Sequence, residues 1–72
     1  MSYQILAPMA GSISRIDVIE GDAVTAASVL LIMESMKMEI PVEAMFAGTV
    51  SKIHCSAGDL VDQDQLLIVL AV

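Results

Sequence analysis

The chain has 72 residues, enough for one small domain but with little room for the cleft of an enzyme active site. Nine acidic residues against three basic ones give a net charge of −6, which argues against binding to nucleic acid phosphates. The longest unbroken apolar run is residues 66–72, whereas a membrane-spanning helix needs about 20 such residues. The first residues lack the pattern of a secretory signal, so we expect a cytoplasmic protein without a membrane span.

Short aliphatic and β-branched runs, separated by Gly-Asp or Gly-Ser/Thr pairs, predict β-strands along the whole chain. No stretch has the apolar spacing of an amphipathic helix with a cap at each end. Strict alternation of apolar and polar residues is broken in the second and sixth predicted strands, which indicates a β-bulge in each. The eight strands are expected at residues 4–7, 12–18, 23–24, 28–34, 38–44, 49–55, 60–61 and 65–71.

The chain contains an internal repeat. Residues 7–34 align with residues 44–71 at an offset of 37 without a gap, and nine of the 28 pairs are identical, where roughly two are expected from ordinary residue usage. All four glycines fall in equivalent positions, where a positive φ or a sharp bend is expected. Four strands cannot bury their own apolar face, so the two copies should close on each other. We therefore predict an all-β fold, a flattened eight-stranded barrel-sandwich hybrid with pseudo-twofold symmetry, as a single domain over residues 1–72 with an aliphatic, methionine-rich core.

The symmetry breaks at the junction of the two copies, residues 34–39, which read Glu-Ser-Met-Lys-Met-Glu. Strand-like segments on both sides require a tight hairpin turn, centred on Met36 and Lys37. Such turns favour Asn-Gly or Gly-X, because positive φ is costly for other residues, yet no glycine is present. The absence of glycine indicates that the side chains of Met36 and Lys37 are themselves required. Lys37, the only basic residue without an equivalent in the other copy, should extend its amine into solvent at the tip.

The neighbours of Lys37 allow two interpretations. Met36 and Met38 have unbranched, polarizable side chains that suit contacts with a partner protein. Alternatively, Lys37 is a solubilising charge and the methionines lean back onto the sheet. Glu34 and Glu39 either orient the hairpin on a partner or are ordinary surface charges. Pro41, further along the descending strand, predicts that this strand lies at a sheet edge.

Several motifs resemble those of biotin carboxyl carrier proteins and the biotinyl domains of multidomain carboxylases. Residues 34–38, Glu-Ser-Met-Lys-Met, look like their attachment motif, and residues 7–11, Ala-Pro-Met-Ala-Gly, resemble their opening. Residues 20–22 and 57–59 resemble their paired turns, and the similarity extends over about residues 5–70. Ser35 stands where that family most often has alanine. The gapless repeat leaves no room for the protruding thumb loop of some carriers, so the chain resembles the thumbless type.

The resemblance implies that Lys37 carries covalent biotin, with Met36 and Met38 as recognition contacts and Glu34 and Ser35 as motif flanks. A biotin protein ligase would attach the biotin. The arm would then carry a carboxyl group, as carboxybiotin, from a biotin carboxylase to a carboxyltransferase, and the domain itself would be a non-catalytic carrier. The carboxyl acceptor stays open, as does whether the chain is a free-standing carrier or a domain of a longer carboxylase or decarboxylase.

Other classes of protein compete with this interpretation. The related lipoyl domains share the fold but usually have Asp-Lys-Ala at the tip, so the two methionines favour biotin over lipoate. An adaptor module, such as the lipoyl-like domains of membrane-fusion export proteins, would not need an exposed Met-Lys-Met tip. A small enzyme lacks a nucleophile paired with a base, because the one histidine, His54, and the one cysteine, Cys55, form no catalytic motif. We expect these two to face opposite sides of a strand and to form no metal site.

Overall fold

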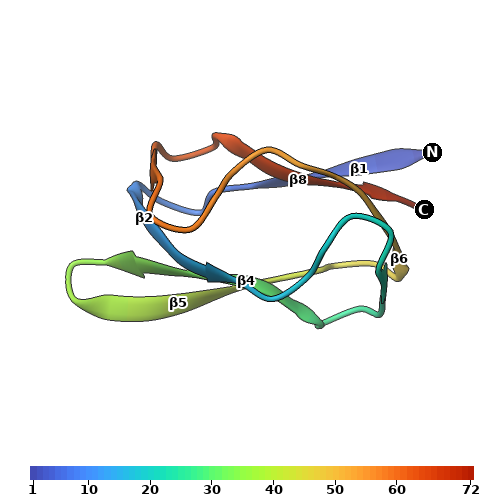
Figure 1. Ribbon diagram of the computed structural model, residues 1–72, viewed down its shortest axis with the longest axis horizontal. Helices are drawn as coiled ribbons and strands as arrows, with labels where there is room; N and C mark the ends of the chain where they lie inside the picture. Colours follow the sequence, from blue (N-terminus) through green and yellow to red (C-terminus); the bar gives the residue numbers. More distant parts are fainter.

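The computed structural model describes all residues, 1–72, and every regular element in it is a β-strand (Figure 1). All eight predicted strands are present, with ends that differ from the prediction by at most two residues. No helix is long and apolar enough to cross a membrane. The strands are β1 (Ser2–Leu6), β2 (Gly11–Ile16), β3 (Ala23–Val24), β4 (Val29–Ser35), β5 (Met38–Glu43), β6 (Gly48–Ile53), β7 (Leu60–Val61) and β8 (Leu66–Ala71).

The strands form two antiparallel four-stranded sheets, ordered β1-β8-β6-β3 and β5-β4-β2-β7, which face each other as a flattened sandwich (Figure 1). Shifting each strand by the repeat offset converts one sheet order into the other, so the expected pseudo-twofold symmetry is confirmed. Each sheet takes two strands from each copy. The copies are therefore interleaved, and neither forms a complete sheet alone.

The predicted bulges occur at equivalent places in the two copies. The register of β2 against β4 shifts between Ile13 and Arg15, and that of β6 against β8 shifts between Val50 and Lys52. Both strands end two residues earlier than predicted, at Ile16 and Ile53. After one more backbone hydrogen bond to the neighbouring strand, each chain turns away into its Gly-Asp loop.

The glycines serve two different purposes. Gly21 and Gly58 have φ of 98° and 93°, as expected for the turn positions. Gly11 and Gly48 do not have positive φ, so the prediction of positive φ is wrong for these two positions. A Cβ on Gly11 would lie 2.5 Å from the Glu34 carbonyl oxygen, and one on Gly48 would lie 2.5 Å from the equivalent oxygen of Ala71. These two glycines allow a close approach of backbones.

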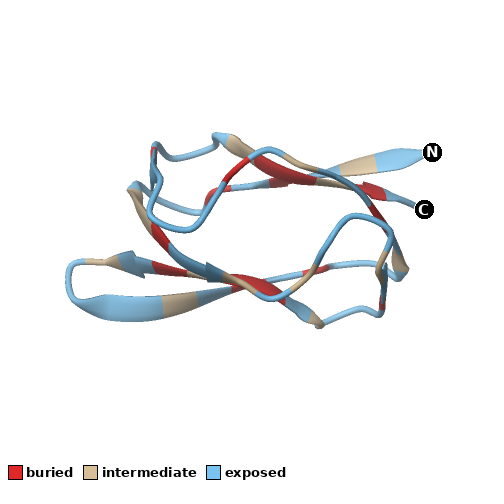
Figure 2. Ribbon diagram, viewed as in Figure 1, coloured by how far each residue is buried: buried red, intermediate tan, exposed pale blue.

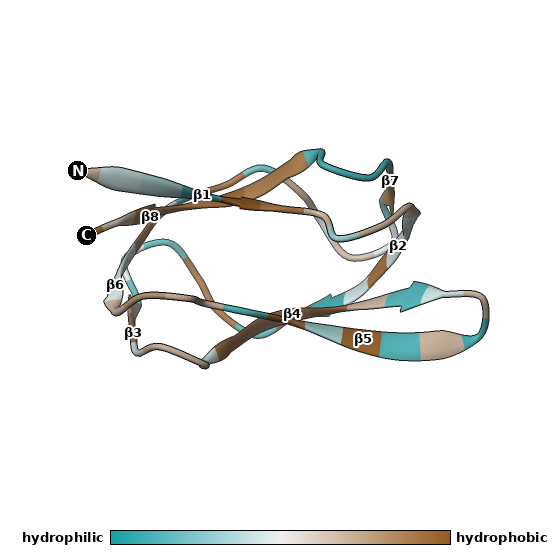
Figure 3. Cartoon of the chain, turned by 180° about the vertical axis from the view of Figure 1, so that it is seen from behind, coloured by the Kyte–Doolittle hydropathy of each residue, from teal (hydrophilic) through white to brown (hydrophobic).

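Buried positions occur on strands of both sheets (Figure 2), and their side chains form one largely aliphatic core. The most hydrophobic segments lie in β4 and β8, each of which is flanked by strands on both sides (Figure 3). The expectation of a methionine-rich core is wrong, because Met33 is the only one of the six methionines that is buried. The single layer between short sheets is filled by inward-facing side chains of regular strands, and most of the other methionines lie in turns, loops or chain ends. The core residues are Ile5, Ala7, Ile13, Val24, Leu30, Leu31, Met33, Val42, Ala44, Val50, Cys55, Val61, Leu67, Ile68 and Leu70.

β1 and β5 each lie at one edge of their sheet, the other edges being β3 and β7, and Pro41 lies in β5 as predicted for an edge. A groove of about 360 Å³ is lined by residues of both edges. Tyr3 and Met45, which line the groove, are joined by a hydrogen bond from the Tyr3 hydroxyl to Met45 Sδ at 3.0 Å. The ring of Tyr3 also meets Phe46 edge to face, with centroids 4.9 Å apart.

The two chain ends lie side by side, and the hairpin of β4 and β5 projects from the opposite end of the molecule (Figure 1). The backbone N–H of Val72 donates to the Met1 carbonyl oxygen at 2.9 Å. The molecule measures 33 × 17 × 17 Å along its principal axes. Any connection made through the termini would therefore leave the hairpin tip unobstructed.

Candidate functional site

The turn between β4 and β5 consists of Met36 and Lys37 alone, whose φ angles are 53° and 65°. Positive φ at both central residues is the mark of a type I′ turn, whose twist matches that of the flanking strands. The predicted two-residue hairpin is therefore confirmed. The other non-glycine residues with positive φ, Ala27 and Asp64, are equivalent positions of the two copies. The left-handed pair at the tip has no such equivalent and costs on the order of 1 kcal/mol or more per residue.

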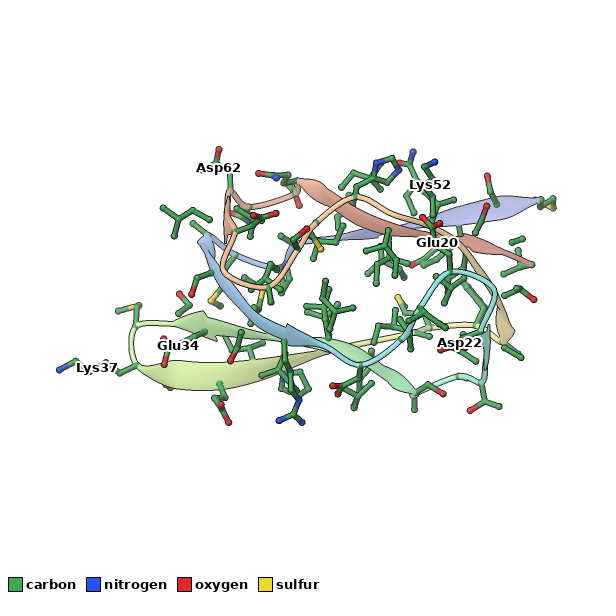
Figure 4. The ribbon with its side chains drawn as sticks, viewed as in Figure 1. Glu20, Asp22, Glu34, Lys37, Lys52 and Asp62 are labelled. Atoms are coloured by element: carbon green, nitrogen blue, oxygen red, sulfur yellow. The ribbon has the colours of Figure 1, made fainter.

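Lys37 points away from both sheets into solvent (Figure 4). The protein's one side-chain salt bridge joins Arg15 to Asp17, and the amine of Lys37 has no hydrogen-bond or ion-pair partner. The other lysine, Lys52, lies on β6, toward the end of the molecule where the termini are (Figure 4). The tip thus presents an unobstructed amine that can enter the active site of another protein.

Met36 and Met38, the neighbours of Lys37 in the chain, add exposed apolar surface at the tip. The two residues are 90% and 60% exposed, respectively. The alternative that they lean back onto the sheet is wrong for Met36 and largely so for Met38. Because a type I′ turn is more easily made with Asn-Gly, the presence of methionine at its first position favours a contact made outside this chain.

Ser35 anchors the stem of the hairpin to the body of the domain. Its hydroxyl donates to the carbonyl oxygen of Ala10, in the loop between β1 and β2, at 2.9 Å. Gly11 permits this approach, because a Cβ there would lie 3.2 Å from the Ser35 Cβ. The role of Ala10 was not foreseen from the sequence. The only sequence signal for this contact was Gly11, which stands next to Ala10 at the start of a predicted strand.

We predict that Ser35→Ala loses about 0.5–1.5 kcal/mol of unfolding free energy, because the hydrogen bond to Ala10 disappears. Labelling of Lys37 should continue, since the hydroxyl bonds to the body of the domain whereas Lys37 points into solvent. Urea unfolding and the rate of biotin incorporation measure the two effects. Ser51→Ala is the matched control, because Ser51 is exposed at the β6 bulge and its side chain has no partner. An equal loss of stability in both variants would contradict the anchoring role.

Glu34 and Glu39 face each other directly across the ladder of β4 and β5. Both are exposed, and neither forms a salt bridge. Like charges in direct opposition destabilise a sheet. The two strands next to the turn therefore carry a pair of carboxylates without a basic partner in the chain. A basic surface on a partner protein would relieve their repulsion.

His54 and Cys55 contribute nothing to this site. They follow β6 rather than belonging to it, although they do face opposite ways, with His54 exposed and Cys55 buried. Burial raises the pKa of the Cys55 thiol, and the carboxylate of Asp59 raises it further. A thiol held in its protonated form is a poor nucleophile at neutral pH. These residues therefore give no support to a catalytic role.

Comparison with known proteins decides the family. A family model described as "Biotin-requiring enzyme" matches residues 3–70. The chain belongs to this family. It is 41% identical over 71 residues to the biotinylated protein TB7.3 homolog of Mycobacterium leprae, covering 99% of this chain and 100% of the relative. It is 46% identical over 65 residues to the biotin carboxyl carrier protein of Streptococcus mutans, covering 90% of this chain and 50% of that protein.

A solved structure supports the fold assignment. The urea carboxylase of Kluyveromyces lactis superposes with a TM-score of 0.93 at 30% sequence identity, covering 99% of this chain and 6% of that one. The resemblance drawn from the sequence motifs is thus confirmed, together with the barrel-sandwich fold. The chain is a biotin carrier domain of the type found in biotin-dependent carboxylases, its cofactor is biotin, and its role is non-catalytic.

Proposed function

We propose that Lys37 is the residue that carries covalent biotin, and that residues 1–72 act as one domain that presents it. One observation carries this assignment. Lys37 is the only lysine at a protruding two-residue turn, where its amine has no partner and lies at the end opposite the termini. Nothing in the chain obstructs a group attached there, so the residues present fit a covalently bound cofactor.

Attachment requires a biotin protein ligase as the first partner. The neutral amine of Lys37 attacks the carboxyl carbon of biotin activated as its adenylate, an amide bond forms, and AMP leaves. Only the neutral amine can attack, so the ligase must accept a proton from the ammonium group as the tip docks. The domain itself contributes only the position and accessibility of the amine.

The residues around Lys37 have separate tasks in this scheme. Met36 and Met38 supply adaptable apolar contacts to the enzymes that bind the tip. Glu34 and Glu39 favour a partner with a basic rim, and Ser35 keeps the stem fixed to the body. The bound cofactor supplies a ureido nitrogen that can accept and release a carboxyl group.

A carboxyl carrier must visit two enzymes, a biotin carboxylase and a carboxyltransferase. The elongated shape, with the termini at one end and the tip at the other, suits this role (Figure 1). A tether at the termini would raise the effective concentration of the tip at both enzymes without covering it. The relatives include both a short protein and parts of long carboxylases, and both arrangements are compatible with this geometry.

The choice of cofactor is tested by offering two enzymes in parallel. The purified protein is incubated with ATP and biotin plus a biotin protein ligase, or with ATP and lipoate plus a lipoyl ligase. Intact mass should show one biotinyl group in the first reaction and an unchanged mass in the second. Preferential lipoylation would overturn the proposed assignment.

A further inference from the structure

The six methionines differ sharply in their access to solvent. Met33 is fully buried in the core, whereas Met36 and Met38 are 90% and 60% exposed. Met45 is also exposed, but its sulfur accepts the hydrogen bond from the Tyr3 hydroxyl. The sulfurs of Met36 and Met38 have no hydrogen-bond partner. They are thus the unengaged thioethers next to the reactive amine.

Exposed thioethers are the ones that peroxides oxidise. The sulfur lone pair attacks one peroxide oxygen, the O–O bond breaks, and the products are methionine sulfoxide and, from hydrogen peroxide, water. The sulfur loses two electrons to the peroxide. A dithiol-dependent methionine sulfoxide reductase reverses the change by oxidising two thiols to a disulfide and releasing the oxygen as water. Peroxide and a thiol-dependent reductase are therefore sufficient for a reversible cycle.

We propose that Met36 and Met38 form a reversible oxidation site that controls the use of Lys37 by its partner enzymes. The proposal rests on the proposed function, in which these side chains make the apolar contacts beside the amine. A sulfoxide replaces a flexible apolar group by a polar one with a strong hydrogen-bond acceptor. In a contact that fits a thioether, the sulfoxide oxygen has no hydrogen-bond donor. This penalty lowers the rate of the reaction at the tip by about tenfold.

The first test concerns the chemistry alone. The folded, biotin-free protein is treated with hydrogen peroxide for increasing times, the peroxide is removed with catalase, and peptides are mapped by mass spectrometry. Met36 and Met38 should be oxidised early and Met33 last. Met45 should lag behind Met36, because its sulfur is hydrogen-bonded. Oxidation of Met33 as fast as Met36, with the fold intact by circular dichroism, would overturn the proposal.

The second test concerns the consequence for Lys37. Oxidised and reduced proteins are compared in the ligase reaction, and, after biotin has been attached, in carboxyl loading by a biotin carboxylase with labelled bicarbonate. At least one of the two rates should fall about tenfold on oxidation and recover after reductase treatment. Oxidising the protein before biotin is attached keeps biotin's own sulfur out of the comparison.

Two variants separate the tip from the other methionines. For every protein, the rate after peroxide is compared with the rate of the same protein before peroxide. In Met36→Leu/Met38→Leu, peroxide should change the rate little. In Met9→Leu/Met45→Leu the tip is intact, so peroxide should lower the rate as in the wild type. Equal rates for oxidised and reduced wild type in both reactions would overturn the inference. If the reduced wild type accepts no biotin at all, the proposed function fails instead, so the two failures are distinguishable.

Discussion

Exchanging the two turn residues, Met36→Lys with Lys37→Met, is expected to abolish biotin incorporation while the domain stays folded. Successive positions of the turn point their side chains in different directions, so the amine would leave its place although composition and charge are unchanged. A displacement of about 1 Å at a reacting group can cost 10²-fold in rate, and this exchange moves the amine by more. Time courses of intact mass in the ligase reaction measure the loss.

The exchange has an internal check on folding. Circular dichroism and the urea midpoint of the exchanged protein should match those of the wild type, because both turn residues remain exposed non-glycine residues with positive φ. Labelling of the exchanged protein at the wild-type rate would show that a lysine at either turn position suffices. That result would contradict the claim that the position of Lys37 matters.

The second large effect concerns the core. Leu30→Ala and Leu67→Ala remove equivalent, fully buried side chains of β4 and β8. Each should cost about 2–5 kcal/mol of unfolding free energy, because the small side chain leaves a cavity. A core of this size supplies only about 3–5 kcal/mol, so both variants should be largely unfolded and poor substrates for the ligase. Urea titrations followed by circular dichroism measure the effect.

Leu60→Ala is the matched control, since Leu60 is 83% exposed and its truncation should change stability by less than about 0.5 kcal/mol. The two core variants should also resemble each other, because the repeat places their leucines in equivalent surroundings. A wild-type midpoint for either variant would contradict the interleaved core.

Much of the architecture could be predicted from the repeat. The gapless offset and the placement of glycines indicated the symmetry, and the broken alternation located both bulges. The hairpin followed from two strand-like segments separated by too few residues for any other connection. These features depend on local backbone requirements, and local requirements leave a clear trace in a sequence.

Other features depend on contacts between distant segments, which periodicity does not reveal. Composition suggested a methionine-rich core, but hydrophobicity alone does not tell a core methionine such as Met33 from a surface one such as Met36. The bond from Ser35 to Ala10 and the backbone approach at Gly11 join segments that lie far apart in the chain.

The most direct measurement is the intact mass of three proteins after incubation with biotin protein ligase, ATP and biotin. The wild type and Lys52→Arg should each gain one biotinyl group, and peptide mapping should place it on Lys37. Lys37→Arg should gain none, because arginine keeps the charge and the turn but has no amine that can be acylated. Equal labelling of Lys37→Arg, or an unlabelled wild type, would contradict the assignment of Lys37 as the biotin carrier.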